Sequence, residues 1–305
     1  MRLSLPFDEM DCTAPNDSGI GRIPLRMLRK ALSPRRRRCV FRLAALILLL
    51  TAVSGGAGVV EAAPRTVHVF VALADNQHQG IIPVPAALGN GSDPQRNLYW
   101  GAAFGVKTFF KGSKDWEFVS SSRPAKAEIL ERCIFRNRQQ DVVLVADAYE
   151  GSQIKSAVSD FLSAAAGRNS EEIPLRAGST ETSISIGGAA DLIVYVGHDA
   201  FMDFQIPPIR GVEGKKPRRT IVLACASKQY FGSYIRETGA EPLLWTTGLM
   251  APEAYTLKAA LDGWIAAEND EAIRQRAAQA YDKYQKCGER AASRLFAAGW
   301  GASAR

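Results

Sequence analysis

A thiol and an imidazole follow two strongly apolar segments of this 305-residue sequence. The segment "TIVLACASK" reaches Cys225 as its apolar run ends, and "DLIVYVGHDA" reaches His198, 27 positions earlier. A histidine beside a cysteine can take the thiol proton, and the resulting thiolate is a nucleophile toward a carbonyl carbon. The same imidazole can then protonate the leaving group. The two residues therefore predict nucleophilic catalysis if the fold brings them together.

A structural interpretation of Cys225 and His198 stands beside the catalytic one. Free cysteine is among the most buried residue types, so a single Cys in a strand is more often part of the core than of a catalytic site. A histidine after a strand is likewise often an ordinary hydrogen-bonded side chain. The catalytic interpretation gains weight only if the two strands are neighbours.

Apolar segments alternate with helical patterns from Arg65 onward. This order is typical of a single α/β domain, here residues 64–305, with a mostly parallel sheet and helices on both faces. Strands are predicted at 66–75, 116–121, 141–149, 191–200, 220–227 and 242–250. Helices are predicted at 97–112, 125–137, 151–167, 228–239 and 270–286, with a further helix that has Pro252 as its first residue.

The predicted strands end in polar residues. In a parallel sheet these ends lie along one edge, where ligands bind in α/β proteins. We therefore expect the strand-end residues to gather there, with Cys225 and His198 on adjacent strands. The residues at the predicted strand ends are Asp75, Asn76, Asp147, His198, Asp199, Cys225, Thr246 and Thr247.

The segments "LIVYVGHDA" and "TIVLACASK" resemble the core of caspase/legumain-like cysteine peptidases. In that family one apolar strand ends in a His, usually followed by Gly, and the next ends in a Cys, commonly as Ala-Cys-x-Ser. The resemblance implies a caspase-haemoglobinase-like α/β fold, with His198 as general acid and base and Cys225 as nucleophile. It also implies that the backbone N–H groups of Asp199 and Cys225 form the oxyanion hole. Asp199 stands where the family usually has Gly, which adds bulk and negative charge beside the oxyanion.

A weaker part of the resemblance lies after the first predicted strand, in "ADNQHQG". This segment is similar to the Asn-x-x-His-Gln segment of legumain-like enzymes, although it is one residue shorter, and it implies that Asn76 orients the catalytic His. By the same resemblance, the pocket for the residue before the cut bond is lined by His78, Asp147, Trp245 and Thr247. The segments "LADNQHQGIIPVP" and "NLYWG" are also similar to a group of exported bacterial proteins of uncharacterised activity.

The expected function is that of a peptidase that acts on a peptide or protein substrate and uses neither a cofactor nor a metal. Two alternatives stay open. In the first, Asp199 prevents catalysis and the fold is a binding protein, with the Pro- and Gly-containing loop 76–96 as its recognition surface. In the second, strand-end residues bind a divalent cation for hydrolysis and Cys225 is dispensable. Those ligands would be Asp75, Asp147, His198 and Asp199.

The distribution of charge gives no support for nucleic-acid binding. Residues 1–63 carry 10 Lys and Arg against 5 Asp and Glu, and the remaining residues carry 28 against 26. The net charge of +7 therefore comes mainly from the first 63 residues. The sequence also contains no Gly-rich phosphate loop after a predicted strand and no Gly-x-Ser-x-Gly segment.

Residues 1–63 are typical of an export leader. The basic segment "RKALSPRRRRCVFR" precedes an apolar run of 11 residues, "LAALILLLTAV", and Val60-Glu61-Ala62 fits a small-x-small cleavage site. We expect cleavage near Ala63 and a periplasmic or secreted protein. The apolar run is shorter than the roughly 20 residues of a membrane-spanning helix. The alternative is an uncleaved leader, which would then be the membrane attachment.

Cleavage of the leader would leave three cysteines in the mature chain. Cys12 and Cys39 would be removed, and in an oxidising compartment one pair among the remaining three can form. Cys133 and Cys287 fall in predicted helices, and a bond between them would leave Cys225 free. The sequence alone does not fix this pairing.

Overall fold

The computed structural model describes residues 63–177, 180–214 and 217–301. The chain divides into two units, residues 1–60 and 61–305, and the described residues belong to the second. The predicted leader segment up to residue 62, including its two cysteines, therefore lies outside the described residues. Among the residues that are described, no helix is both long and apolar enough to cross a bilayer.

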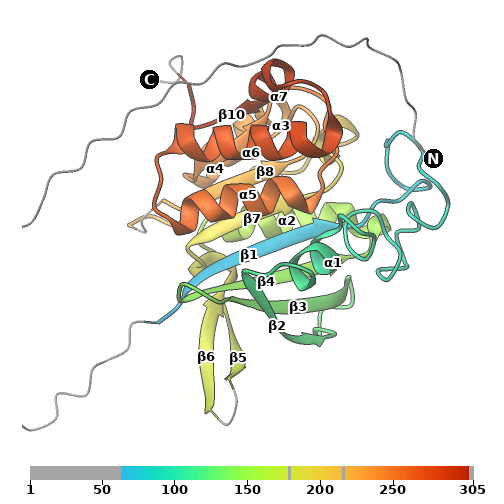
Figure 1. Ribbon diagram of the computed structural model, residues 1–305. Coiled ribbons are helices and arrows are strands. Elements are labelled where there is room, and N and C mark those ends of the chain that lie inside the picture. The colour runs from blue at the N-terminus through green and yellow to red at the C-terminus, as the bar shows by residue number, and fades with distance from the viewer. Residues whose placement is uncertain (1–62, 178–179, 215–216, 302–305) are drawn as a thin grey trace, which may run out of the picture. The chain divides into compact units, whose positions relative to one another are not determined.

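The described residues form an eight-stranded sheet in the order β10-β9-β8-β7-β1-β4-β3-β2 (Figure 1). The pairings from β9 through to β4 are parallel, whereas β2, β3 and β10 join the sheet through antiparallel pairings. The predicted α/β class with a mostly parallel sheet is confirmed. The strands are β1 (Arg65–Ala72), β2 (Trp116–Ser122), β3 (Ile129–Asn137), β4 (Val142–Tyr149), β7 (Leu192–Val196), β8 (Arg219–Leu223), β9 (Glu241–Thr246) and β10 (Phe296–Ala297).

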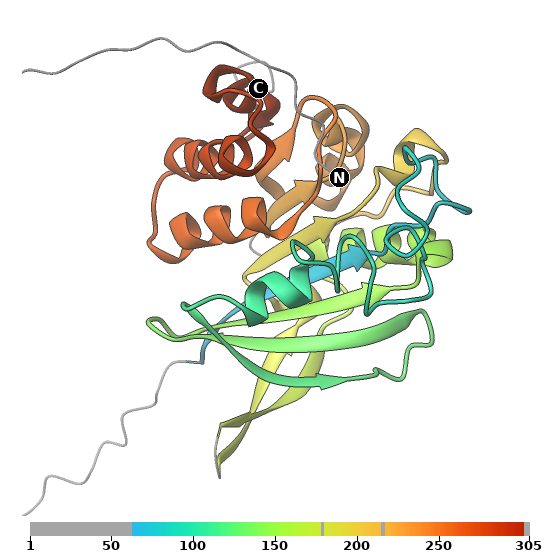
Figure 2. The ribbon, with the colours of Figure 1, turned by 45° about the vertical axis from the view of Figure 1, so that its right-hand side comes forward.

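Helices cover both faces of the sheet, which is why the central strands are apolar on both sides. Along β1, Val67, Val69 and Val71 pack into one core with α1, α5 and α6, whereas Phe70 and Ala72 pack into a second core with α2 and α4. Figures 1 and 2 show α5 and α6 on one side of the sheet and α2 on the other. The helices are α1 (Val106–Lys111), α2 (Ile154–Ala165), α3 (Ser227–Tyr230), α4 (Gly232–Thr238), α5 (Ala254–Ile265), α6 (Asp270–Gln285) and α7 (Glu289–Leu295).

A separate two-stranded hairpin follows α2, in a segment where the sequence predicted neither a strand nor a helix. Strands β5 (Glu171–Ala177) and β6 (Thr180–Ile186) pair antiparallel and project from the sheet (Figure 2). Ile173 and Ile184 pack with Val143 and Val145 of β4 in a third, smaller core. The hairpin is therefore anchored through one apolar face, which an isolated two-stranded ribbon would lack.

The helix predicted at 125–137 is wrong, because this segment forms β3 and the loop before it. Its helix-favouring composition includes Glu131 and Arg132, which look like solvent-facing residues. Both are instead buried in the strand and neutralised by distant partners: Glu131 bonds to Lys107, and Arg132 bonds to Asp147. Burial of paired charges thus hides the alternation that marks a strand.

The helix predicted at 97–112 is shorter than expected. Only α1 is helical, and residues 97–104 form turns. At Gly105 the backbone passes so close to Trp100 that an added Cβ would lie 2.4 Å from its carbonyl. This tight turn ends the preceding segment and starts α1, so the two glycines in "NLYWGAAFG" are turn signals.

Two further expectations need correction. Pro252 does not begin the helix after β9, because α5 has Glu253 as its N-cap and starts at Ala254. Cys133 lies in β3 and not in a helix, and Cys287 follows α6; both are free thiols in this structure, so the pairing that the sequence left open is not made here.

Truncating a side chain in the centre of the sheet should destabilise the fold strongly. Leu144→Ala removes a fully buried side chain from β4, so we expect a loss of about 2–5 kcal/mol in the free energy of unfolding. Leu249→Ala is the matched control because this leucine is 68% exposed, and its effect should stay below about 0.5 kcal/mol. Denaturant titration measures both; similar losses would contradict the placement of the two leucines.

Candidate functional site

Cys225 and His198 follow neighbouring parallel strands. β7 and β8 pair in register from Leu192 opposite Arg219 to Val196 opposite Leu223, and each of the two candidate residues comes two positions after its strand. The predicted adjacency of the strands is therefore confirmed, and both residues lie at the carboxyl edge of the sheet. His198 is buried and Cys225 is partly exposed.

At this edge the segments that follow two neighbouring strands, β1 and β7, lead toward opposite sides of the sheet. From β1 the chain passes to β2 at one edge of the sheet, comes back through β3 to β4 beside β1, and then continues to β7 on the other side of β1. The loops after β1 and β7 therefore diverge, which opens a crevice in α/β proteins of this kind. The loop after β1 contains Asp75, Asn76 and His78, and the loop after β7 contains His198 and Asp199.

Asp203 holds the ring of His198. The Nε2 atom lies 2.8 Å from Asp203 Oδ2, and a carboxylate can only accept, so the ring proton lies on Nε2. In the neutral ring the lone pair is then on the other nitrogen, Nδ1, which has no hydrogen-bond partner among the described residues. The same carboxylate oxygen accepts the Gly80 N–H at 3.1 Å. Asp203 thus ties the histidine to the loop after β1.

The sequence pointed to Asn76 for this orienting role, and the structure gives the residue a different one. The Asn76 amide donates to the Val84 carbonyl at 2.8 Å and accepts the Val84 N–H at 3.1 Å. It therefore closes the loop 76–96 on itself. Asp203 follows His198 by only five residues, and a 3₁₀ turn, Ala200–Met202, folds it back toward the ring. A carboxylate shortly after the candidate histidine was the signal that could have identified it.

The sulfur of Cys225 contacts the backbone of Met250. It accepts the Met250 N–H at 3.4 Å and lies 3.6 Å from the carbonyl oxygen. Burial raises the pKa of the Cys225 thiol above its ordinary value of 9.0, the Met250 N–H lowers it, and the charge of Asp199 raises it further. In the described residues no hydrogen bond joins Cys225 to His198. The resting side chain is therefore a protonated thiol.

The chain makes a strained turn directly after Cys225. Ala226 has φ 46° and ψ 33°, in the left-handed region, where a residue other than glycine is strained by roughly 1–3 kcal/mol. Its N–H donates to the Gly248 carbonyl at 2.8 Å, and the next residue, Ser227, bonds through its N–H to the Thr246 hydroxyl at 3.1 Å. These bonds hold the turn between the ends of β8 and β9.

Asp199 is a fully buried carboxyl that is only half paired. Its Oδ1 atom accepts the Phe201 N–H at 3.0 Å, whereas Oδ2 is buried without a partner among the described residues. Burial raises the pKa of Asp199 from 3.8 to about 7; the Phe201 amide opposes the shift, and the charge of Asp203 increases it. Near neutral pH this carboxyl is therefore divided between its neutral and charged forms.

The two backbone N–H groups expected to bind an oxyanion are available. Neither the amide of Asp199 nor that of Cys225 has a hydrogen-bond partner in the described part of the chain. Unpaired backbone donors at strand ends are the kind of group that stabilises a developing negative charge on a carbonyl oxygen.

The residues expected to line the substrate pocket do not gather in one place. His78 is exposed and bonds through Nδ1 to Asp75 Oδ2 at 2.9 Å. Trp245 is buried in β9 and packs edge to face on Trp300. Thr247 is exposed, and its hydroxyl donates to the Arg294 carbonyl at 2.7 Å, beside β10. Trp245 is thus a core residue, and of the three only His78 lies in the loop after β1.

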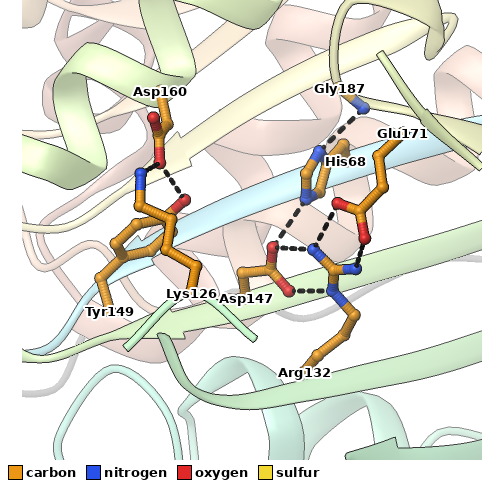
Figure 3. A network of polar contacts seen from close by, with 8 residues as sticks. All are labelled: His68, Lys126, Arg132, Asp147, Tyr149, Asp160, Glu171 and Gly187. Carbon is orange, nitrogen blue, oxygen red and sulfur yellow. Dashed lines mark hydrogen bonds and ion pairs between the residues drawn. The ribbon is translucent and has the colours of Figure 1, made fainter. Parts of the chain in front are cut away.

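Asp147 lies inside β4, opposite Phe70 of β1, and not at the strand end. Its carboxylate accepts Arg132 Nε at 2.6 Å and Nη2 at 2.8 Å, and His68 Nε2 at 3.0 Å. Although burial alone would raise the pKa of Asp147, the bonds from Arg132 and His68 lower it below its ordinary value. The guanidinium also pairs with Glu171 at 2.7 Å. Figure 3 shows this chain of contacts, which the sequence did not reveal.

The structure does not assemble the metal ligands that the sequence suggested. Asp75 pairs with His78, His198 pairs with Asp203, and Asp147 is enclosed by its own partners. Within the described ranges, no group of three or more His, Cys, Asp or Glu side chains is placed to hold a metal ion. The metal alternative therefore gains no ligand set from the described residues.

Asp199 should make the stability of the protein depend on pH. Because its pKa is raised in the folded state, its contribution is fully present below the ordinary value of 3.8 and is lost as the pH rises through about 7. Asp199→Asn cannot ionise and keeps the acceptor for Phe201. We expect it to be more stable than wild type by roughly 2–4 kcal/mol near pH 8, with little difference near pH 4. Denaturant titration at both pH values measures this, with the exposed Glu213→Gln as control; a pH-independent difference would contradict it.

Removing the cation from the buried pair should be costly. Arg132→Met leaves the Asp147 carboxylate inside the core without its guanidinium, so we expect a loss of roughly 3–5 kcal/mol in unfolding free energy. Arg138→Met removes an exposed arginine that lies 3.5 Å from Glu117, and it should cost less than about 1 kcal/mol. Thermal or denaturant unfolding distinguishes the two; equal effects would mean that Asp147 is not an enclosed carboxylate.

Comparison of the chain with family models, with curated proteins and with solved structures found no match. The geometry and chemistry of the carboxyl edge are therefore the basis for any functional assignment. They combine a thiol, a histidine whose tautomer is fixed, and two free backbone donors.

Proposed function

We propose that this protein is a thiol-dependent peptidase in which Cys225 attacks the scissile carbonyl and His198 transfers the proton. The observation that carries the proposal is the hydrogen bond from His198 to Asp203. Both residues follow β7, which is the neighbour of β8, the strand before Cys225. This hydrogen bond leaves Nδ1 as a base at the edge where the thiol lies. The order β4-β1-β7-β8-β9 of the parallel strands also supports a caspase-haemoglobinase-like fold.

The proton follows one route in this mechanism. His198 Nδ1 takes the proton of the Cys225 thiol as the sulfur bonds to the carbonyl carbon, and the N–H groups of Asp199 and Cys225 receive the charge on oxygen. The imidazolium then protonates the leaving amine as the carbon–nitrogen bond breaks. Water, activated by the same Nδ1, hydrolyses the thioester and regenerates the thiol. Asp203 is a positioning residue, because it acts only through His198.

The raised pKa of Cys225 favours a thiol that is deprotonated during the attack over a thiolate that is formed in advance. A thiolate and imidazolium formed in advance would require a lowered thiol pKa, whereas burial raises it here. The histidine must therefore act as a base during the attack. The Met250 N–H, 3.4 Å from the sulfur, stabilises the negative charge as it forms.

A binding protein without catalysis is the second candidate function. The observation that favours it is Asp199, a buried carboxyl whose charge opposes ionisation of Cys225. In that case the loop 76–96 would contact the partner. For either function, we propose a peptide or protein as the bound molecule and an exported location directed by the leader.

Peptide cleavage by defined variants tests the proposal. The full chain is incubated with a mixed library of peptides, and new termini are identified by mass spectrometry. Cys225→Ser should lower the rate by roughly a thousandfold or more, because a serine hydroxyl is a much weaker acid than a thiol and the same histidine activates it poorly. Asp203→Asn should lower kcat/KM by about a hundredfold and change its pH profile, because the tautomer of His198 is no longer fixed.

Cys287→Ser is the matched control, because this exposed cysteine lies outside the site, and it should retain wild-type cleavage. Cleavage that persists in Cys225→Ser would overturn the role of the thiol. If the wild-type chain cuts no library peptide, the binding function stands instead.

A further inference from the structure

A cavity of about 320 Å³ lies away from the carboxyl-edge site, on the face of the sheet that α2 covers. Its floor is formed by β1, β3 and β4, and its walls are formed by α2, the loop before β3 and the start of β5. The volume lies at the lower end of the range for small-molecule sites. Phe70, Ile129 and Tyr149 give it an apolar lining, and the polar groups of Figure 3 line the rest.

The polar floor of the cavity has little hydrogen-bonding capacity left for an acceptor ligand. Arg132 directs four N–H bonds at Asp147 and Glu171. His68 accepts the Gly187 N–H on Nδ1 at 3.1 Å and donates from Nε2 to Asp147. Its ring is therefore neutral and both its nitrogens are used.

The carboxylates around the cavity outnumber the cations. Arg132 and Lys126 carry positive charge, whereas Asp147, Asp160 and Glu171 carry negative charge, and all five line the cavity. With His68 neutral, one negative charge is left over in a partly enclosed space. Such a charge attracts a cation more strongly than it would in bulk water.

One of the carboxylates that line the cavity, Asp160, has an oxygen that can still accept a hydrogen bond from a ligand. Lys126 Nζ and the Tyr149 hydroxyl both donate to Asp160 Oδ2, and the other Asp160 oxygen has no partner among the described residues. The Glu171 side chain is about half exposed, although it is paired with Arg132. A ligand that donates hydrogen bonds therefore finds an unpaired oxygen on Asp160, with Glu171 as a second negative charge in the lining.

We propose that this cavity binds a small organic cation, a primary amine or a guanidinium, with a short apolar body. The cationic group bonds to the unpaired oxygen of Asp160, the charge of Glu171 in the second polar cluster of the lining attracts it from a distance, and the apolar body packs on Phe70, Ile129 and Tyr149. This site is independent of the proposed peptidase function, because none of its residues belongs to the carboxyl-edge site.

Three probes that share a five-carbon chain separate charge from shape. Pentylammonium, pentanol and pentanoate are titrated into the full chain by isothermal calorimetry at one ionic strength. Pentylammonium should bind at least about tenfold more tightly than pentanol, because it alone neutralises the excess charge. Pentanoate should bind most weakly.

Two variants locate the bound cation. Glu171→Gln and Asp160→Asn should each weaken pentylammonium binding by about five- to tenfold and leave pentanol binding unchanged. Glu172→Gln is the matched control: this neighbouring glutamate bonds to Ser183 on the hairpin and does not line the cavity, so the affinity should not change.

Three results would overturn the proposal. If pentanoate binds most tightly and Glu171→Gln strengthens it, the cavity is an anion site that Glu171 occupies in the free protein. If the three probes bind equally, the site recognises only the apolar body. If none binds, or if Glu172→Gln has the same effect as Glu171→Gln, the cavity does not hold a cation.

Discussion

Parallel pairing on both sides of β1 is the constraint on which the rest of the structure depends. β1 pairs with β4 from Arg65 opposite Val142 and with β7 from Val67 opposite Leu192, so the strands that follow in the chain are divided between its two sides. Every parallel strand then ends at the same edge. Asp203 accepts hydrogen bonds from His198, in the segment after β7, and from Gly80, in the loop after β1, so it joins the ends of these two neighbouring strands. The position of the histidine is therefore a consequence of the sheet topology combined with one carboxylate.

Two buried aspartates show how differently the same side chain behaves when its partners differ. Asp147 receives the bidentate guanidinium of Arg132 and a histidine N–H, which stabilise its charge inside the core. Asp199 receives one backbone amide and is repelled by Asp203, so burial dominates and its pKa rises. The first carboxylate stabilises the fold, whereas the second destabilises it as the pH rises. Proteins depart from favourable local electrostatics mainly at functional sites. The unfavourable burial of Asp199 therefore agrees with the function proposed for the carboxyl edge, whereas Asp147 lies in a fully paired network.

The sequence predicted the parts of the structure that depend on local pattern. The continuous apolar runs before His198 and Cys225 indicated two buried strands, because strands covered on both faces have that composition, and the alternation of strands and helices indicated that they are neighbours. It failed where the decisive partner is distant in the chain. Glu131 and Arg132 look exposed until Lys107 and Asp147 are placed beside them, and therefore β3 was predicted as a helix. The cavity under α2 could not have been predicted, since its lining comes from segments between His68 and Gly187.

The left-handed turn at Ala226 has a consequence for how the edge can evolve. A glycine there would relax the backbone and stabilise the folded chain, yet it would also widen the range of backbone angles open at position 226, directly after the cysteine. Alanine keeps that range narrow at the expense of some thermodynamic stability. Alanine at this position therefore gives a more restricted backbone and a less stable fold than glycine would, and the two residues differ by a single methyl group.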